Sequence, residues 1–158
     1  RMDHGVIISR TQHGFVCANA GVDASNVGTD DVVTLLPEDP DRSAAGLRAS
    51  ILEELGVDVG VVVSDSFGRP WRLGITDIAL GISGFAPLAD LRGEVDTEGR
   101  QMHATVVAIA DELASTAELA SGKTSRRPAV LIRGARLPAG AGSVAGDVVM
   151  PVEQDLFR

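Results

Sequence analysis

The stretch 59–77 constrains the fold more than any other part of the chain. It begins with Val61, Val62 and Val63, a β-branched apolar run that is typical of a strand buried on both faces. The run is followed at once by Ser64-Asp65-Ser66-Phe67-Gly68-Arg69-Pro70-Trp71-Arg72. The pattern therefore predicts a buried strand that ends at a carboxylate and a hydroxyl, beside a loop rich in glycine, proline and arginine.

Two interpretations of this strand end are open. A carboxylate and a hydroxyl held beside such a loop are a common arrangement for a divalent cation next to a phosphate. The alternative is a capped strand end followed by two surface arginines. Spacing does not decide between them, so phosphate chemistry is a hypothesis at this stage.

Composition narrows the class of protein. The chain has 158 residues, enough for one domain with a hydrophobic core, and we predict a single domain over 1–158. Its formal net charge of -8 argues against a nucleic-acid partner. No apolar run approaches the roughly 18 residues that span a bilayer, so we expect no membrane segment. Cys17 is the only cysteine, which excludes a disulfide framework and a cysteine zinc site and favours a cytoplasmic location.

Apolar patterning predicts the other elements. Strands are expected at 5–9, 15–18, 31–36, 77–82 and 128–134, the last of them buried. A polar loop at 92–100 is expected between two short strands. A helix is predicted at 43–55, because 37–41 carry start signals and Gly56 is a natural stop. Its predicted buried stripe consists of Ala44, Leu47, Ile51 and Leu55.

A second helix is predicted at 106–120. Its apolar face consists of Val106, Ile109, Ala110, Leu113 and Ala117. Asp111 and Glu112 are expected on the solvated side, with a carboxylate that faces the site as the open alternative. Residues 121–125 then read Ser121-Gly122-Lys123-Thr124-Ser125. This loop resembles the end of a phosphate-binding P-loop, but it follows a helix and lacks the upstream glycine, so we reject a P-loop.

Two segments hold candidate cation ligands. The segment 19–26 is dense in small and Asx residues and contains Asp23 and Asn26. Together with Asp65 and Ser66 it offers oxygen ligands from separate elements, as a hard cation requires. Arg69 and Arg72 are candidates for holding a phosphate or carboxylate. No catalytic role is assigned to a histidine, and Cys17 is expected to be inert.

Four motifs together resemble the F420 γ-glutamyl ligase family, the coenzyme F420-0:L-glutamate ligases. They are G-F-V-C-A-N-A-G-V-D-A-S-N at 14–26, S-D-S-F-G-R-P-W-R-L-G-I-T-D-I-A-L-G at 64–81, A-D-E-L-A at 110–114 with G-K-T at 122–124, and P-A-V-L-I-R-G at 128–134. The resemblance covers nearly the whole chain in order. It implies an α+β fold of mixed β-sheets with flanking helices, and a homodimer.

The resemblance also implies an activity, which is GTP- and metal-dependent addition of L-glutamate to coenzyme F420-0 and to its growing glutamate tail. The implied cofactors are Mg²⁺ or Mn²⁺, two per site, with K⁺ as a further candidate. Phosphoryl transfer from GTP to the substrate carboxylate would give an acyl phosphate, which the amine of glutamate attacks. Such chemistry depends on positioning and charge neutralisation.

Residue roles follow from the same resemblance. Asp23 and Asp65 would ligate one metal and Ser66 a second, while Asn26 would contact GTP. Ser66 stands where the family usually has threonine, which keeps the hydroxyl. Residues implied to lie along the nucleotide are Ser121, Gly122, Lys123, Thr124 and Ser125. The catalytic set that we predict is Asp65 with Arg69 and Arg72, the two arginines holding the acidic substrate.

One departure from the family concerns the N-terminal segment, which supplies several GTP contacts and precedes the point where this sequence starts. Two rival functions therefore remain open. One is a metal-dependent phosphohydrolase that uses the same carboxylates without glutamate. The other is a catalytically incomplete fragment of the ligase.

Overall fold

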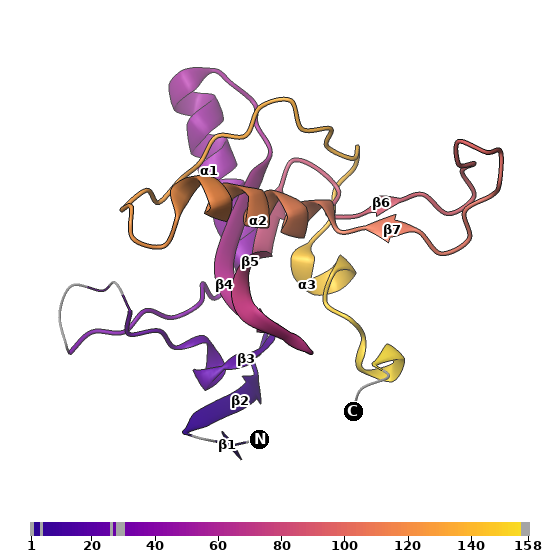
Figure 1. Ribbon diagram of the computed structural model, residues 1–158. Helices are drawn as coiled ribbons and strands as arrows, with labels where there is room; N and C mark the ends of the chain where they lie inside the picture. Colours follow the sequence, from indigo (N-terminus) through magenta and orange to yellow (C-terminus); the bar gives the residue numbers. More distant parts are fainter. Residues whose placement is uncertain (1, 4, 26, 28–30, 156–158) are drawn as a thin grey trace.

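The computed structural model describes residues 2–3, 5–25, 27 and 31–155 (Figure 1). Its elements in chain order are β1 (Met2–Asp3), β2 (Val6–Arg10), β3 (Val16–Ala18), the 3₁₀ turn η1 (Asn19–Gly21), α1 (Pro40–Leu55), β4 (Val61–Arg69), β5 (Arg72–Ser83), β6 (Ala89–Asp90), β7 (Val106–Val107), α2 (Ile109–Ser121), α3 (Val144–Asp147) and η2 (Val152–Gln154). Small antiparallel sheets and flanking helices make this an α+β fold, as predicted.

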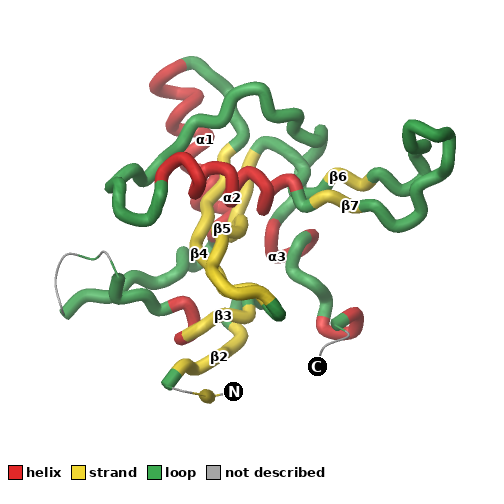
Figure 2. Tube along the Cα trace, in the orientation of Figure 1, coloured by secondary structure: helices red, strands yellow, loops and turns green. Residues whose placement is uncertain are grey.

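The centre of the fold is the antiparallel ribbon of β4 and β5, which is paired from Val61 opposite Ser83 to Arg69 opposite Arg72, with two register shifts. Figure 2 shows this pair as the longest strands of the molecule, with α2 crossing them. All three α-helices contact β5. The ribbon is therefore the frame on which the helices are mounted.

A β-bulge in β5 accounts for its buried run. Val63 pairs with Gly81 but Ser64 pairs with Ala79, so Leu80 is the additional residue in β5. Ala79 through Ile82 are all buried, beneath α1 and α2. The core consists of residues of the ribbon, of α2 and α3, and of the segments just before β3 and just after β5. Its members are Phe15, Phe67, Ala79, Leu80, Ile82, Phe85, Ala110 and Val144.

Helix carboxylates satisfy two backbone donors of β5. The N–H of Ala79 donates to Oδ1 of Asp111 on α2 at 2.9 Å, and the N–H of Ile82 donates to Oδ1 of Asp41 on α1 at 2.8 Å. Buried N–H groups need such partners where no strand supplies them. Asp111 is therefore half-buried and structural, and our expectation that it lies on the solvated side is wrong.

Helix α1 ends as predicted but begins three residues earlier, at Pro40, and its predicted buried stripe is wrong. Asp39 accepts the N–H of Arg42 at 2.9 Å, and Gly56 adopts the left-handed conformation at φ 67°. Ala44 is fully buried, whereas Leu47 is 53% and Leu55 71% exposed. The reason is that α1 packs on the ribbon through its first turns, and the rest of the helix projects beyond it (Figure 1).

Two predicted strands do not form. Within 31–36, the structure records one isolated bridge, between Thr34 and Asp23. The segment 128–134 is not assigned to a strand, and Leu131 is 68% exposed. Both segments have the apolar composition of strands. In the described part of the chain, however, neither has a neighbour that completes a hydrogen-bonded ladder.

Strand β4 is longer than predicted. It continues past Ser64 to Arg69 because β5 pairs with it along that whole length. Asp65 and Ser66 therefore lie within a strand, not at its end, and Val61, Val62 and Val63 are half-buried instead of buried on both faces.

The segment between β6 and β7 is a polar hairpin, as predicted for 92–100 (Figure 1). Val106 and Val107 belong to β7, so α2 starts three residues later than expected, at Ile109. Across the described residues, no helix combines the length and hydrophobicity needed to cross a membrane.

Candidate functional site

A polar cluster is centred on Ser66 in the middle of β4. Its hydroxyl donates to Oδ1 of Asp77, the residue opposite it on β5, at 2.7 Å. The same oxygen accepts from Nζ of Lys123, in the loop after α2, at 2.8 Å. Ser64, two residues before Ser66, donates to Oδ2 of Asp77 at 3.3 Å. Three separate segments thus meet at one hydroxyl.

The pleat of β4 places these side chains on two opposite faces of the strand. Successive residues of a strand point to opposite faces, so Ser64 and Ser66 share one face and Asp65 lies on the other. Asp65 shares its face with Phe67. The ring of Phe67 packs edge to face on that of Phe15, with 6.1 Å between the ring centroids. Asp65 is therefore directed to the side of the ribbon that carries β3.

Asp65 is a half-buried carboxylate. Burial raises its pKa, and the charges of Asp23 and Asp77 act in the same direction. The N–H of Ser66, which donates to Oδ1 at 2.7 Å, and the ammonium of Lys123 lower the pKa but do not offset burial. A carboxylate in this position gains stability from a bound cation.

Asp23 follows η1 in an exposed loop and is held as an anion. Its Oδ1 accepts from the N–H of Ser25 at 2.8 Å and its Oδ2 from the Ser25 hydroxyl at 2.7 Å. These bonds lower the pKa of Asp23, and Lys123 contributes in the same direction. Asp23, Asp65 and Lys123 thus interact electrostatically, although they come from three parts of the chain.

The other predicted site residues are placed differently. Asn26 lies outside the described residues. In the 121–125 loop, Lys123 has a recorded contact with the cluster, whereas the Ser121 hydroxyl donates to the carbonyl of Glu118 at 3.4 Å. Gly122 ends α2 at φ 66°, and Thr124 and Ser125 are exposed.

Arg69 and Arg72 close the β4–β5 hairpin and are exposed. Among the described contacts, neither reaches Asp65 or Ser66. Arg69 lines a hollow of about 550 Å³ between β5 and α2. Its other lining residues are Thr76, Ile78, Ala108, Asp111, Glu112, Ser115 and Thr116. The structure thus separates the arginines from the carboxylates that the sequence places a few residues away.

Two neighbours of the site were missed in the sequence. Asp77 had no usable signal, because counting from the turn at 70–71 places Ile75 opposite Ser66. The register shift between Gly68 and Arg69 is what brings Asp77 there. Cys17 on β3 had none either. Burial raises the pKa of the Cys17 thiol, and the charge of Asp65 raises it further.

The carboxylates of Asp23 and Asp65 suit a hard cation, since they belong to separate elements and Asp65 is desolvated. The described residues include no group of three or more His, Cys, Asp or Glu side chains placed to hold a metal ion. A cation at Asp23 and Asp65 would therefore complete its shell with other oxygens, such as those of water or phosphate.

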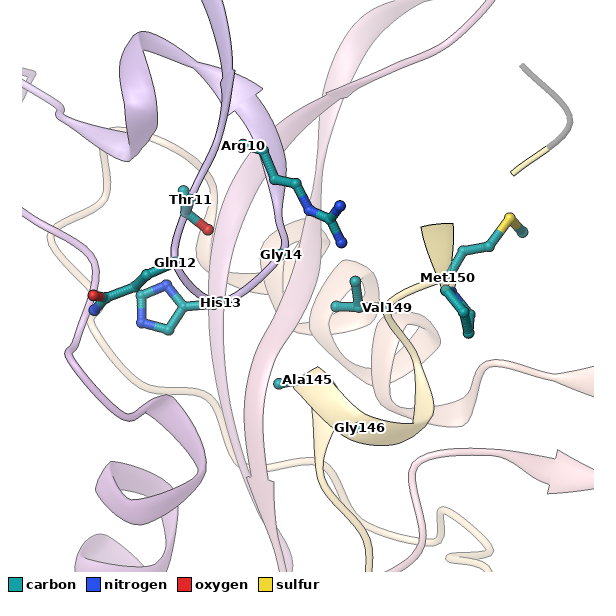
Figure 3. A pocket seen from close by; sticks show the side chains of 10 residues that line it. Arg10, Thr11, Gln12, His13, Gly14, Ala145, Gly146, Val149 and Met150 are labelled. Carbon is teal, nitrogen blue, oxygen red and sulfur yellow. The ribbon is translucent and has the colours of Figure 1, made fainter. Parts of the chain in front are cut away.

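A second hollow, of about 350 Å³, lies between the β2–β3 turn and α3 and contains none of the predicted site residues. Figure 3 shows the Arg10 side chain extending toward Val149 and Met150. Oγ1 of Thr11 and Nδ1 of His13 are buried there without a recorded hydrogen-bond partner.

Comparison with known proteins agrees with the motifs. Residues 1–134 match the family model described as F420-0:Gamma-glutamyl ligase. The chain is 48% identical over 153 residues to the coenzyme F420:L-glutamate ligase of Methanocaldococcus jannaschii, covering 96% of this chain and 60% of the relative. The chain is 45% identical over 162 residues to the coenzyme F420:L-glutamate ligase of Methanothermobacter thermautotrophicus, and the match covers 100% of this chain and 63% of the relative.

The Methanopyrus kandleri coenzyme F420:L-glutamate ligase is 50% identical over 135 residues, covering 85% of this chain and 53% of the relative. The chain thus spans about 60% of the length of the first two relatives. The match includes both Asp-bearing segments and the Lys123 loop. The chain therefore belongs to the F420-0:gamma-glutamyl ligase family.

Proposed function

We propose that this chain carries the activity of a GTP- and divalent-cation-dependent ligase that adds L-glutamate to coenzyme F420-0 and to its growing glutamate tail. Support comes from the family match and from relatives named coenzyme F420:L-glutamate ligase. The observation that carries the proposal is the meeting of Asp23, Asp65 and Lys123 around one strand of the ribbon.

Asp23 and Asp65 are the residues that would hold Mg²⁺ or Mn²⁺. A bound cation would supply neutralisation of the charge on the phosphate oxygens. The chain itself contributes orientation, because Asp23 is fixed by two hydrogen bonds from Ser25 and Asp65 by the N–H of Ser66. Phosphoryl transfer depends mostly on such positioning.

The proposed reaction has two steps. A terminal carboxylate oxygen of F420-0 attacks the γ-phosphorus of GTP, and the bond to the bridging oxygen breaks with release of GDP. The α-amine of L-glutamate then attacks the acyl carbon, an amide bond forms, and phosphate leaves with the former carboxylate oxygen. The amine loses its protons to solvent or a base.

The remaining residues take supporting roles in this proposal. Asn26 contacts GTP, and the loop from Ser121 to Ser125 lies along the nucleotide, with Lys123 nearest the phosphates. Arg69 and Arg72 hold the acidic substrate, and the hollow lined by Arg69 offers it about 550 Å³. As exposed guanidinium groups they suit phosphate or carboxylate.

We also propose a homodimer. The exposed apolar side chains of the β2–β3 sheet, such as Ile7 and Val16, would be covered by a second copy. Light scattering on the purified chain would give the mass directly. A monomer at all concentrations would contradict this part of the proposal.

The test of function is an incubation of the chain with GTP, Mg²⁺ or Mn²⁺, L-glutamate and F420-0, read by mass spectrometry. The proposal predicts a product heavier by one or more glutamyl units, formed only when GTP and the metal are both present. A parallel reaction uses a form extended at its N-terminus to the length of the relatives. Product from the extended form alone would make this chain an incomplete part of the ligase.

The same incubation tests the alternative that the chain is a phosphohydrolase. Release of phosphate from GTP that does not depend on glutamate or F420-0, with no glutamylated product from either form, would contradict the ligase. It would favour a metal-dependent phosphohydrolase that uses the same carboxylates.

A further inference from the structure

Lys123 is the only lysine of the chain, whose other basic residues are arginines or histidines. Its Nζ lies 2.8 Å from Oγ of Ser66. An ammonium is a compact point charge, unlike the planar guanidinium of arginine. The chain therefore places its single compact organic cation on the hydroxyl that the family resemblance assigns to a second metal.

The Ser66 oxygen is already engaged by both neighbours. A serine hydroxyl has one proton to donate and two lone pairs to accept with. The proton goes to Asp77, and one lone pair accepts from Lys123. A divalent cation on the remaining lone pair would bind about 2.1 Å from the oxygen. It would then lie close to a like charge, and the carboxylate on that face, Asp77 of β5, already accepts from the hydroxyls of Ser64 and Ser66.

The net charge of the cluster also indicates a single divalent cation. Asp23, Asp65 and Asp77 contribute three negative charges, and Lys123 contributes one positive charge. One divalent cation balances the difference before any nucleotide is bound. Asp65, which is desolvated, lies on the opposite face of β4 from Ser66, so a cation at Asp65 does not need the serine oxygen.

We propose that the ammonium of Lys123 takes the place of the second metal ion, so that the chain binds one divalent cation, at Asp23 and Asp65. This inference rests on the metal dependence in the proposed function. It adds that Ser66 is a positioning residue, which Asp77 orients and which holds Lys123, and is not a metal ligand. The ammonium can then meet phosphate oxygens as a permanent cation, whatever the metal concentration.

The experiment is a titration of the nucleotide-free chain with Mn²⁺, followed by calorimetry and by electron paramagnetic resonance. The two ions of a two-metal site lie about 3.5–4 Å apart and are magnetically coupled. We expect one ion per chain and an uncoupled spectrum. In Lys123→Gln, which offers a neutral oxygen, we expect a second ion, whereas Lys123→Arg should stay at one ion.

A control separates the roles of charge and ligand. Lys123→Met removes the charge without offering a ligand. This variant should bind phosphate more weakly near Ser66 and should still bind one Mn²⁺. A wild-type chain that binds two ions, coupled or not, would overturn the inference. So would a Lys123→Gln chain that binds a single ion as the wild type does.

The number of bound ions and the formation of glutamylated product are measured separately, so failure of this inference can be distinguished from failure of the proposed function. Two bound ions together with glutamylated product would overturn the role of Lys123 and leave the ligase standing. No bound ion and no product would overturn both. One bound ion in the absence of product would support the role of Lys123 and count against the ligase.

Discussion

Ser66 on β4 and Asp77 on β5 face each other across the ribbon, and the Ser66 hydroxyl donates to Oδ1 of Asp77 at 2.7 Å. This bond fixes the direction of the serine proton, so that a lone pair is available to Lys123. The contact belongs to paired strands and not to a loop. A site mounted in this way keeps its geometry without a ligand, which favours catalysis by positioning.

Removing the Ser66 hydroxyl should therefore slow the proposed ligation more than it destabilises the fold. In Ser66→Ala, Asp77 and Lys123 lose the oxygen between them, and we expect kcat/KM to fall by about 10- to 100-fold, as for outer-shell partners of metal ligands. Ser66→Thr keeps the hydroxyl and should stay within a few-fold of the wild type. Steady-state kinetics with GTP checks both. Equal losses in the two variants would show that the hydroxyl is not what matters.

Asp23→Ala should weaken binding of the divalent cation, because it removes a carboxylate that Ser25 holds in place. Calorimetric titration with Mg²⁺ should give a Kd at least about 10-fold higher than that of the wild type. Asp90→Ala is the matched control, since Asp90 lies on β6 and pairs with Arg92. If both variants bind Mg²⁺ like the wild type, Asp23 is not a ligand.

Asp65→Asn should abolish glutamyl transfer and leave the fold intact. Turnover by the variant should be too low to measure, because the amide removes the negative charge that the cation needs. Near-normal turnover would exclude Asp65 from the metal site. The far-ultraviolet circular dichroism spectrum should match that of the wild type, which separates loss of activity from loss of structure.

The same variant should change how stability depends on pH. Burial raises the pKa of Asp65 above 3.8, so the folded chain binds this proton more tightly than the unfolded chain. That contribution is complete below the unfolded pKa and is lost as the pH rises through the folded pKa. Without divalent cations, Asp65→Asn should therefore exceed the wild type in free energy of unfolding near neutral pH.

The difference should shrink as the pH falls toward 3.8, the ordinary value for the group. Urea unfolding across that range measures it. Added Mg²⁺ should raise the stability of the wild type but not of Asp65→Asn, since only the former binds the ion. A variant that is less stable than the wild type near neutral pH would contradict an Asp65 whose pKa is raised by burial.

Gly81 is required where β5 passes α1. A Cβ at this position would lie 2.1 Å from the carbonyl carbon of Pro40, so one backbone would have to move. Gly81→Ala should cost about 3 kcal/mol or more in the free energy of unfolding. Gly46→Ala is the matched control, because Gly46 lies in α1 with open space around its Cβ position. It should stabilise the chain by about 0.5–1 kcal/mol.

Urea denaturation of the two glycine variants measures both changes in the free energy of unfolding. If Gly81→Ala unfolds at the same urea concentration as the wild type, α1 does not pack on β5 as described. The contrast with Gly46→Ala guards against a general effect of replacing glycine by alanine.

Local signals in the sequence predicted that α1 and α2 form, and Gly56 marked the end of α1, although each helix start differs from the prediction by three residues. They failed where the outcome depends on a distant partner. Segments 31–36 and 128–134 have strand composition, but a strand also needs a neighbour to pair with. Leu47 and Leu55 have helical spacing, yet the ribbon reaches only the first turns of α1.

The candidate site shows the same division. Asp23, Asp65 and Ser66 were predicted as site residues from residue type and from motifs that resemble the family. Asp77 was missed because its role depends on strand register, and Asp111 was misplaced because it serves a backbone N–H of β5. Lys123 was assigned only to the vicinity of the nucleotide. Its contact with Ser66 joins positions 57 residues apart, which no local pattern predicts.

The most direct test of the ligase follows one oxygen atom. F420-0 whose terminal carboxylate is labelled with ¹⁸O is incubated with the chain, GTP, Mg²⁺ and L-glutamate, and the released phosphate is examined by mass spectrometry. Passage through an acyl phosphate predicts phosphate that carries one labelled oxygen for each amide formed. Unlabelled phosphate would contradict the account, because its fourth oxygen would then come from water, as in a hydrolase.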